Sequence, residues 1–240
     1  MKILPIIKKI FPLFILSLTF ISAHAQLDVG ADIVSRYLWR GQLLANGSAL
    51  QPWVSYSTGS DNISFEIGAW GSYGLSNGND GTEADLYMSL TTGPVTFTLT
   101  DYFFPTDNAF TGADANDNYF SYKKDVTGHV FEIAGSFDGT DNIPVSLGIY
   151  YNFSGADAEN SIYTKLAYAA SDNLEIYLEG GNGWYSFEEE DKDDTYTLVG
   201  LGITYSKEIV ISDKFSLPIF GTFAVNPNLE KPYIVFGVSF

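Results

Sequence analysis

Apolar and polar residues alternate with a period of two along most of the chain. In the first such segment the apolar positions are Leu27, Val29, Ala31, Ile33, Tyr37 and Trp39, and the polar ones are Asp28, Asp32, Arg36 and Arg40. Successive side chains of a β-strand point to opposite faces of a sheet, so the alternation predicts strands with one apolar and one polar face. Helical spacing is not evident.

Twelve segments repeat this alternation. They run through residues 27–39, 54–58, 63–70, 83–90, 95–99, 131–137, 145–153, 162–168, 174–178, 199–205, 217–225 and 234–240. An even number of antiparallel strands, each with one apolar face, is typical of a single-chain transmembrane β-barrel. The sequence therefore predicts an all-β, up-and-down barrel of about 12 strands that the C-terminal strand closes.

The connections between these segments alternate in length. Expected periplasmic turns are Gly59-Ser60-Asp61, Thr92-Gly93 and Ser171-Asp172-Asn173, and expected external loops are Gly41 to Ser48, Leu75 to Gly81, Pro105 to Gly128 and Phe187 to Asp194. Short periplasmic turns and long external loops are typical of outer-membrane barrels. This asymmetry disfavours a soluble β-sandwich, which also alternates but packs its apolar faces inward.

Some positions do not fit a regular ladder. Pro52 and Pro218 lie inside predicted strands, where we expect bulges or shifted boundaries, because proline cannot donate to the ladder. Asp101 has the parity of the lipid face. The segment from Tyr119 to Lys124 is a candidate strand extension above the membrane, which leaves the strand count uncertain by two.

The N-terminus is expected to direct export. Lys2, Lys8 and Lys9 precede an apolar run from Ile10 to Ile21, and Ala23-His24-Ala25 offers small residues for cleavage. We expect residues 1–25 to be a cleaved signal peptide and residues 26–240 to form the barrel domain. No apolar stretch of about twenty residues follows, which excludes a helical inner-membrane protein.

Composition narrows the possible functions further. The leader carries three of the 12 Lys and Arg and none of the 29 Asp and Glu, so the remaining chain has nine cations and a net charge of −20. Nucleic acid is therefore not an expected partner. Cysteine is absent, which removes disulfides, thiol catalysis and thiolate metal sites. The aromatic content of 16% suits belts at two membrane interfaces.

Several short motifs resemble one family of barrels. Ser35-Arg36-Tyr37-Leu38-Trp39-Arg40-Gly41, Ala49-Leu50-Gln51-Pro52, Gly68-Ala69-Trp70-Gly71 and Glu83-Ala84-Asp85-Leu86-Tyr87 are similar to the first four strands of the TorF-type porin family and its Bacteroidetes relatives. The similarity is clearest over residues 27 to 92. It implies an outer-membrane barrel of a Gram-negative cell with a pore, and identifies no substrate.

The C-terminus carries a second recognisable pattern. Phe236, Val238 and Phe240 place apolar residues at every second position up to a terminal Phe. This resembles the signal that the outer-membrane assembly machinery reads. The expected location is the cell outer membrane, with the assembly machinery, outer-membrane lipid, lipopolysaccharide and small hydrophilic solutes as partners.

The polar faces of the strands predict the chemistry of the lumen. Inward positions carry the acids Asp28, Asp32, Glu66, Glu83, Asp85, Glu132, Glu175 and Glu179 and the cations Arg36, Arg40 and Lys165. One hypothesis is a passive channel for small hydrophilic solutes whose acidic wall prefers cations. The other is that Arg36 and Arg40 neutralise Glu66, Glu83 and Asp85 in a network that fills a closed barrel.

Inward aromatic residues also have two interpretations. Trp53, Trp70, Tyr87, Tyr150, Tyr163 and Tyr177 either fill a narrow lumen, which we favour, or form a stacking track for sugars. The candidate constriction residues are Arg36, Arg40, Glu66, Trp70, Glu83, Asp85, Tyr87 and Lys165.

Other functions find weaker support in the sequence. An outer-membrane acyl hydrolase would need a histidine base, and His129 is the only one beyond the leader; no G-x-S-x-G element is present. Divalent ions are possible ligands of Glu188-Glu189-Glu190-Asp191 with Asp193-Asp194, or of Asp107, Asp114 and Asp117, but neither group matches a calcium loop. We expect a non-enzymatic protein without cofactor or bound metal; the alternative to a channel is a surface-binding, adhesive or structural barrel.

Overall fold

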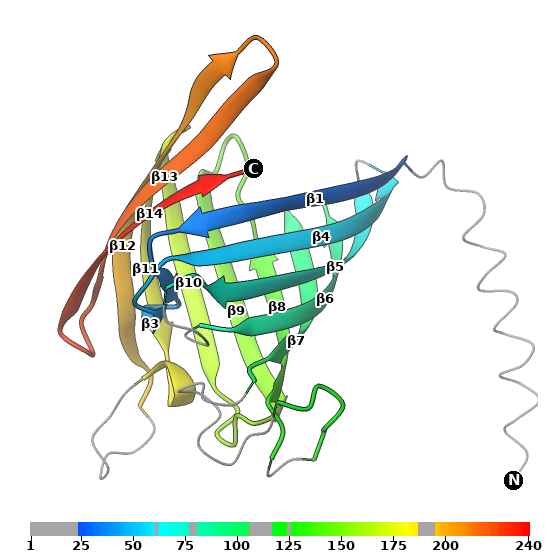
Figure 1. Cartoon of the computed structure of the whole chain (residues 1–240), viewed down its shortest axis with the longest axis vertical. Helices are drawn as coiled ribbons and strands as arrows, with labels where there is room; N and C mark the ends of the chain where they lie inside the picture. Colours follow the sequence, from blue (N-terminus) through cyan, green and yellow to red (C-terminus); the bar gives the residue numbers. More distant parts are fainter. Residues whose placement is uncertain (1–23, 61, 77–80, 106–116, 124–125, 187–194) are drawn as a thin grey trace, which may run out of the picture.

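The chain folds as a closed antiparallel β-barrel in the computed structural model, which describes residues 24–60, 62–76, 81–105, 117–123, 126–186 and 195–240. Twelve strands of this described part follow one another around the wall, from β1 through β14 and down to β4 (Figure 1). They are β1 (His24–Val34), β4 (Ala49–Ser60), β5 (Ile63–Gly74), β6 (Glu83–Thr92), β7 (Val95–Phe103), β8 (His129–Phe137), β9 (Val145–Gly155), β10 (Ile162–Ser171), β11 (Leu174–Gly181), β12 (Thr197–Ser212), β13 (Phe215–Asn226) and β14 (Lys231–Ser239). The predicted fold class is confirmed.

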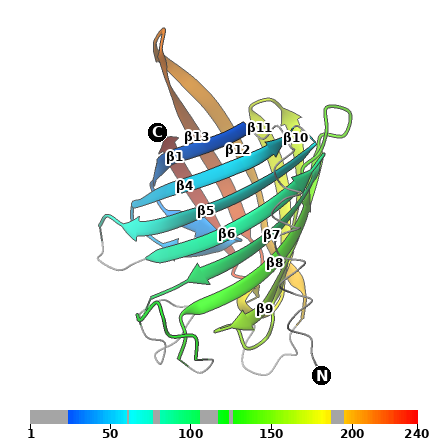
Figure 2. The same ribbon diagram turned by 90° about the vertical axis from the view of Figure 1, so that its right-hand side faces the viewer.

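The apolar parity of the strands points outward. Leu27 and Val29 of β1 are 70% and 71% exposed, and Leu178 of β11 is also exposed. Inward neighbours such as Glu179 and Tyr177 are buried instead. Figure 2 shows the tilted strands side by side, and exposed apolar side chains occur on strands all around this wall. None of the described helices is long and apolar enough to cross a membrane.

Connection length distinguishes the two ends of the barrel. At one end, called the turn end here, short turns link β4 to β5, β6 to β7, β10 to β11 and β12 to β13, and β1 begins. The other end, the loop end, carries the long connection between β7 and β8. The predicted turns at Thr92-Gly93 and Ser171-Asp172-Asn173 are confirmed, because each links two neighbouring strands at the turn end. Residues 1–23, which hold most of the predicted signal peptide, and the predicted loop 187–194 lie outside them.

The first predicted strand is wrong in its second half. β1 ends at Val34, and the chain then forms a separate hairpin of β2 (Tyr37–Trp39) and β3 (Gln42–Ala45). Tyr37 and Trp39 were expected on the lipid face, and Gly41 to Ser48 in an external loop. Instead Tyr37 is buried inside the barrel against Trp70, because the chain bends at Ser35-Arg36 and folds back.

The irregular positions are accommodated without the expected bulges. Pro52 keeps its place opposite Ala31, while β4 and β5 pair on either side of it but not at Pro52 itself. Pro218 pairs with Glu208 of β12, but the other edge of β13 is unpaired at this position, because the pairing with β14 begins at Ile219. A proline without an N–H donor is tolerated at such unpaired edges. Residues 119–123 form no strand, so the predicted extension is also wrong.

The wall closes across a short seam. β14 pairs with β1 through Asp32, Ile33 and Val34, and Phe240 exchanges backbone hydrogen bonds with Ala31. β1 continues from there to His24 paired on its other edge with β4. The β12–β13 hairpin projects beyond the rest of the turn end (Figure 1). The barrel wall is therefore uneven at the turn end beside the seam.

Candidate functional site

The β2–β3 hairpin lies within the barrel and carries Arg40 at its tip. Its two turn residues, Arg40 and Gly41, have positive φ values of 50° and 74°, as a tight hairpin with a type I′ turn requires. A Cβ on Gly41 would come within 2.1 Å of the carbonyl oxygen of Val199 in β12, and Asn226 donates from Nδ2 to the Gly41 carbonyl at 2.9 Å. The hairpin tip therefore lies directly against the barrel wall.

Arg40 forms a two-pronged ion pair with Glu132 of β8. Its Nη1 and Nη2 donate to the two carboxylate oxygens, the second at 2.9 Å. Arg40 also donates to the hydroxyls of Tyr185 and Tyr102, and Tyr102 in turn donates to Glu132 at 2.9 Å. Arg40 is 9% exposed and Glu132 1%. Paired guanidinium and carboxylate groups of this kind give both strength and orientation.

Aromatic rings surround the same guanidinium. The Arg40 Cζ lies 4.5 Å from the ring centroids of Trp39 and Tyr150, 4.6 Å from that of Tyr163 and 5.2 Å from that of Tyr185. Ring faces within about 6 Å attract a cation. The rings come from the hairpin, β9, β10 and the short 3₁₀ turn η2 (Gly183–Tyr185). We call Arg40, Glu132 and these four rings the Arg40 cage.

Burial and neighbouring charges shift the pKa values of two cage residues that lie outside the wall strands, Arg40 and Tyr185. Burial alone would lower the pKa of Arg40, but the adjacent Glu132 carboxylate reverses this, and the pKa lies well above its ordinary value. Burial raises the pKa of Tyr185. Arg40 therefore stays cationic and Tyr185 keeps its hydroxyl proton, so the hydrogen bond between these two residues does not depend on ordinary changes of pH.

Further contacts hold the hairpin at the loop end. Tyr37 donates to the Glu83 carboxylate at 2.8 Å, and Gln42 donates from Nε2 to the Trp184 carbonyl at 2.6 Å. Behind Tyr185, Asn152 donates to Asp157 at 2.8 Å. Apart from Trp184, these residues are buried, so the hairpin is packed against the wall at this level.

The turn-end half of the lumen is different, because its polar groups are accessible. Lys165 and Glu175 form an ion pair at 2.9 Å with side chains 36% and 42% exposed. Asp28 and Glu66 lie on inward parity and are not buried. The barrel is thus a cup: an acidic vestibule open at the turn end, and a packed floor made by the hairpin and the Arg40 cage.

A luminal cavity of about 240 Å³ lies between the hairpin and the wall of β10 to β14. Arg36, Gln51, Lys165, Tyr177 and Glu179 are among its lining residues. On the hairpin side, the cavity is lined by residues between Arg36 and Gly41. Because Lys165 of the vestibule also lines it, the cavity lies between the vestibule and the floor.

The predicted constriction residues therefore divide into groups. The ion pair of Arg40 is with Glu132, so the expected pairing with Glu66, Glu83 or Asp85 is wrong. Glu83 and Asp85 are buried beside the hairpin, where Asp85 accepts from the Phe103 backbone N–H. Arg36 and Lys165 line the cavity, Trp70 packs on Tyr37, and Glu66 and Tyr87 lie in the vestibule wall.

Sequence reasoning missed two residues that hydrogen-bond to Arg40. They are Tyr102, near the end of β7, and the cage residue Tyr185, which follows β11 in a segment with no strand periodicity. One local feature could have indicated the buried contacts. Arg40 precedes Gly41 in the hairpin turn, at a position where Asn, Asp or Gly is usual. The inward aromatic residues Tyr150 and Tyr163 pack around Arg40, which agrees with aromatic filling of the lumen.

His129 has a structural role outside the lumen. Its Nδ1 lies 2.7 Å from Asp101, and its Nε2 lies 2.6 Å from the Tyr119 carbonyl, which can only accept. Nε2 therefore donates and has no free lone pair to activate a serine, which argues against the hydrolase hypothesis. Asp101 does lie on the outward parity, opposite Leu86 and Phe131, and His129 is its partner.

The candidate ion-binding loops remain untested. The Glu188 to Asp194 stretch, Asp107 and Asp114 lie outside the described residues, and only Asp117 is within them. Among the residues that are described, no three His, Asp or Glu side chains are arranged to hold a metal ion.

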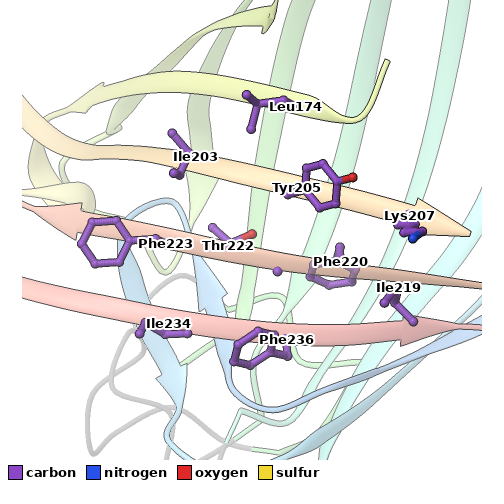
Figure 3. A pocket seen from close by; sticks show the side chains of 11 residues that line it. Leu174, Ile203, Tyr205, Lys207, Ile219, Phe220, Thr222, Phe223, Ile234 and Phe236 are labelled. Carbon is purple, nitrogen blue, oxygen red and sulfur yellow. The ribbon is translucent and has the colours of Figure 1, made fainter. Parts of the chain in front are cut away.

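A second hollow lies on the outer face of β11 to β14. It has a volume of about 430 Å³ and is lined mainly by apolar side chains, with Tyr205 and Lys207 on β12 (Figure 3). Gly221 of β13, which has no side chain, pairs with Tyr205 of β12 on one side and with Phe236 of β14 on the other. This hollow belongs to the outward band and not to the lumen.

No family model matches the chain. No curated protein matches it either. Among solved structures, a variant of the Rh. blastica porin covers 90% of this chain and 99% of its own, with 14% identity and a TM-score of 0.32. A second variant of that porin, with the same coverage, has 12% identity and a TM-score of 0.33.

Proposed function

We propose that this protein is an outer-membrane porin for passive diffusion of small hydrophilic solutes, with the β2–β3 hairpin as its constriction. The observation that carries the proposal is the cup: a water-accessible polar lumen that ends at a folded-in hairpin. A purely structural barrel has no need for an accessible vestibule lined by Asp28, Glu66 and the Lys165–Glu175 pair. The outward apolar band supports a location in lipid, with the turn end in the periplasm.

The proposed charge preference is for cations. The accessible carboxylates of the vestibule outnumber its cations, since Arg40 is already neutralised by Glu132. An acidic wall raises the local concentration of cations and hinders anions.

A non-conducting barrel is the second candidate, and the burial of the Arg40 cage favours it. If the cage holds the hairpin permanently, solutes stop at the floor of the cup. The two candidates differ in one measurable property, which is whether ions cross the purified protein.

Planar-bilayer recording on the full-length purified protein tests both. We expect small, discrete, cation-selective conductance steps from the wild type. Gly41→Ala brings a Cβ against the Val199 carbonyl and should displace the hairpin, so we expect conductance to rise several-fold. Gly93→Ala is the matched control, because its Cβ would meet nothing within 4 Å, although its φ of 55° is equally positive.

Two outcomes would contradict the proposal. Absence of discrete conductance from both wild type and Gly41→Ala would establish the non-conducting barrel. A reversal potential that shows anion preference would overturn the acidic-vestibule argument while leaving the channel in place.

A further inference from the structure

We infer that the luminal cavity beneath the hairpin is a binding site for a small carboxylate solute, with Arg36 as its main anchor. This inference rests on the proposed function, but it concerns a solute that is held at the floor of the cup and not the ions that the acidic vestibule favours. The cavity of about 240 Å³ shares Lys165 with the vestibule and is lined by the hairpin, β4 and β10 to β14.

Two side chains that line this cavity, Arg36 and Gln51, have donor groups without partners. Among the residues that the structure describes, no hydrogen bond or ion pair involves the Arg36 side chain, which is partly exposed to the lumen. Gln51 is 7% exposed, and its Nε2 is buried with no hydrogen-bond partner. A buried polar group without a partner costs free energy, so a ligand that supplies an acceptor to Gln51 is favoured.

One carboxylate beside the cavity is already engaged, because Glu175 pairs with Lys165 at 2.9 Å. Lys165 has further donor capacity beyond that pair, because an ammonium group carries three N–H bonds. Its Nζ also lies 4.7 Å from the centroid of the Tyr177 ring, which holds the side chain along the cavity wall.

Carboxylate fits this donor set better than other oxyanions. A guanidinium binds a planar carboxylate through two parallel hydrogen bonds. The proximity of Glu179, which carries like charge, disfavours a doubly charged phosphate more than a singly charged carboxylate. At roughly 30 Å³ per water in the liquid, the cavity takes the equivalent of about eight waters, which matches a small organic acid.

The test is binding of succinate to the full-length barrel in detergent micelles, followed by saturation-transfer NMR. Succinamide, the neutral isostere, and inorganic phosphate are the comparison probes. We expect saturable succinate binding with a Kd on the order of 1 mM and no saturable binding of succinamide. Tighter binding of phosphate than of succinate, or equal binding of succinamide, would overturn the assignment.

Variants identify the anchor. Arg36→Gln should weaken succinate binding at least about tenfold, as loss of a charge-assisted hydrogen bond does. Lys214→Gln, in the exposed β12–β13 turn, is the matched loss of charge and should change nothing. A shift between heated and unheated bands on gels verifies that each variant is folded.

Asp32→Asn separates ligand binding from an internal neutralising role of Arg36. Asp32 lies opposite Gln51 in the β1–β4 register, and its Oδ1 is buried without a partner. Removing its negative charge should tighten succinate binding. If Asp32→Asn lost succinate binding, the proposed carboxylate site at Arg36 would be wrong.

Failure of this inference and failure of the proposed function can be told apart. Binding in micelles does not require current. A barrel that conducts but does not bind succinate refutes the carboxylate site alone, and one that binds succinate but does not conduct refutes the porin alone.

Discussion

At the scale of single residues, Arg40 occupies a position that is unfavourable for it locally. Its positive φ is a conformation that non-glycine residues rarely adopt and that costs about 1 kcal/mol or more. The Glu132 ion pair, the tyrosine hydroxyls and the surrounding rings offset that cost. The Arg40 cage therefore explains why a strained arginine, and not Asn or Gly, stands at the hairpin tip.

This interpretation predicts strong coupling between Arg40 and Glu132. Arg40→Met leaves the buried Glu132 carboxylate unpaired and should lower the free energy of unfolding by about 3–5 kcal/mol. The double variant Arg40→Met with Glu132→Leu removes both charges and should recover at least half of that loss. Urea unfolding in lipid vesicles measures each value. Losses that simply add in the double variant would show that the two residues act independently.

At the scale of elements, β1 is the strand whose two edges differ most. Along one edge β1 pairs with β4 continuously from His24 to Val34. Along the other edge it pairs with β14 only from Ala31 onward. Antiparallel ladders alternate the residues whose backbone groups face each neighbour. Because Ala31 exchanges its bonds with Phe240, Val29 and Leu27 direct their N–H groups toward the side where β14 has ended.

Amide hydrogen exchange measured by NMR in micelles reveals this edge. We expect the N–H groups of Leu27 and Val29 to exchange at least about 100-fold faster than those of Asp28 and Gly30, which face β4. Equal protection along the strand would mean that another segment pairs with this edge.

At the scale of the whole molecule, the barrel is inverted relative to a soluble domain. Large apolar side chains cover the outside, and charged and aromatic side chains fill the inside. The apolar hollow on β11 to β14 is part of this surface, and Lys207 at its turn-end side is suited to a lipid phosphate. Lipid is therefore the solvent in which the outer face is stable.

A pair of arginine substitutions tests that inversion. Leu178→Arg on the outward face of β11 should destabilise the barrel in lipid vesicles by about 2–4 kcal/mol. Ser89→Arg, inward on β6 and opposite Glu66, should cost about 1 kcal/mol or less. Comparable effects of the two substitutions on urea unfolding would contradict the assignment of the faces.

Much of the fold was predictable because it is local. The period of two identifies each strand and assigns each side chain to a face, as Leu86 and Asp85 illustrate on β6. The lengths of the connections indicate which end is which. Twelve strands, the turn end and the loop end therefore follow from neighbours within a few residues of one another.

The candidate site was predictable only in its composition. The inward Arg36, Arg40 and Lys165 were identified from parity, but the expected partners of Arg40 were not, because Glu132 is 92 residues away in the chain. Tyr102 and Tyr185 are brought to Arg40 only by closure of the barrel. No local pattern encodes such contacts.

By itself, the sequence determined the number of strands, the faces of the barrel and the acidic character of the lumen, since each depends on short-range alternation and composition. Tertiary structure alone decided that residues 37–45 fold inward as a hairpin. Their alternation is the same as that of a wall strand, and the choice rests on the positive φ of Arg40 and Gly41 together with a buried ion pair that exists only once the barrel is closed.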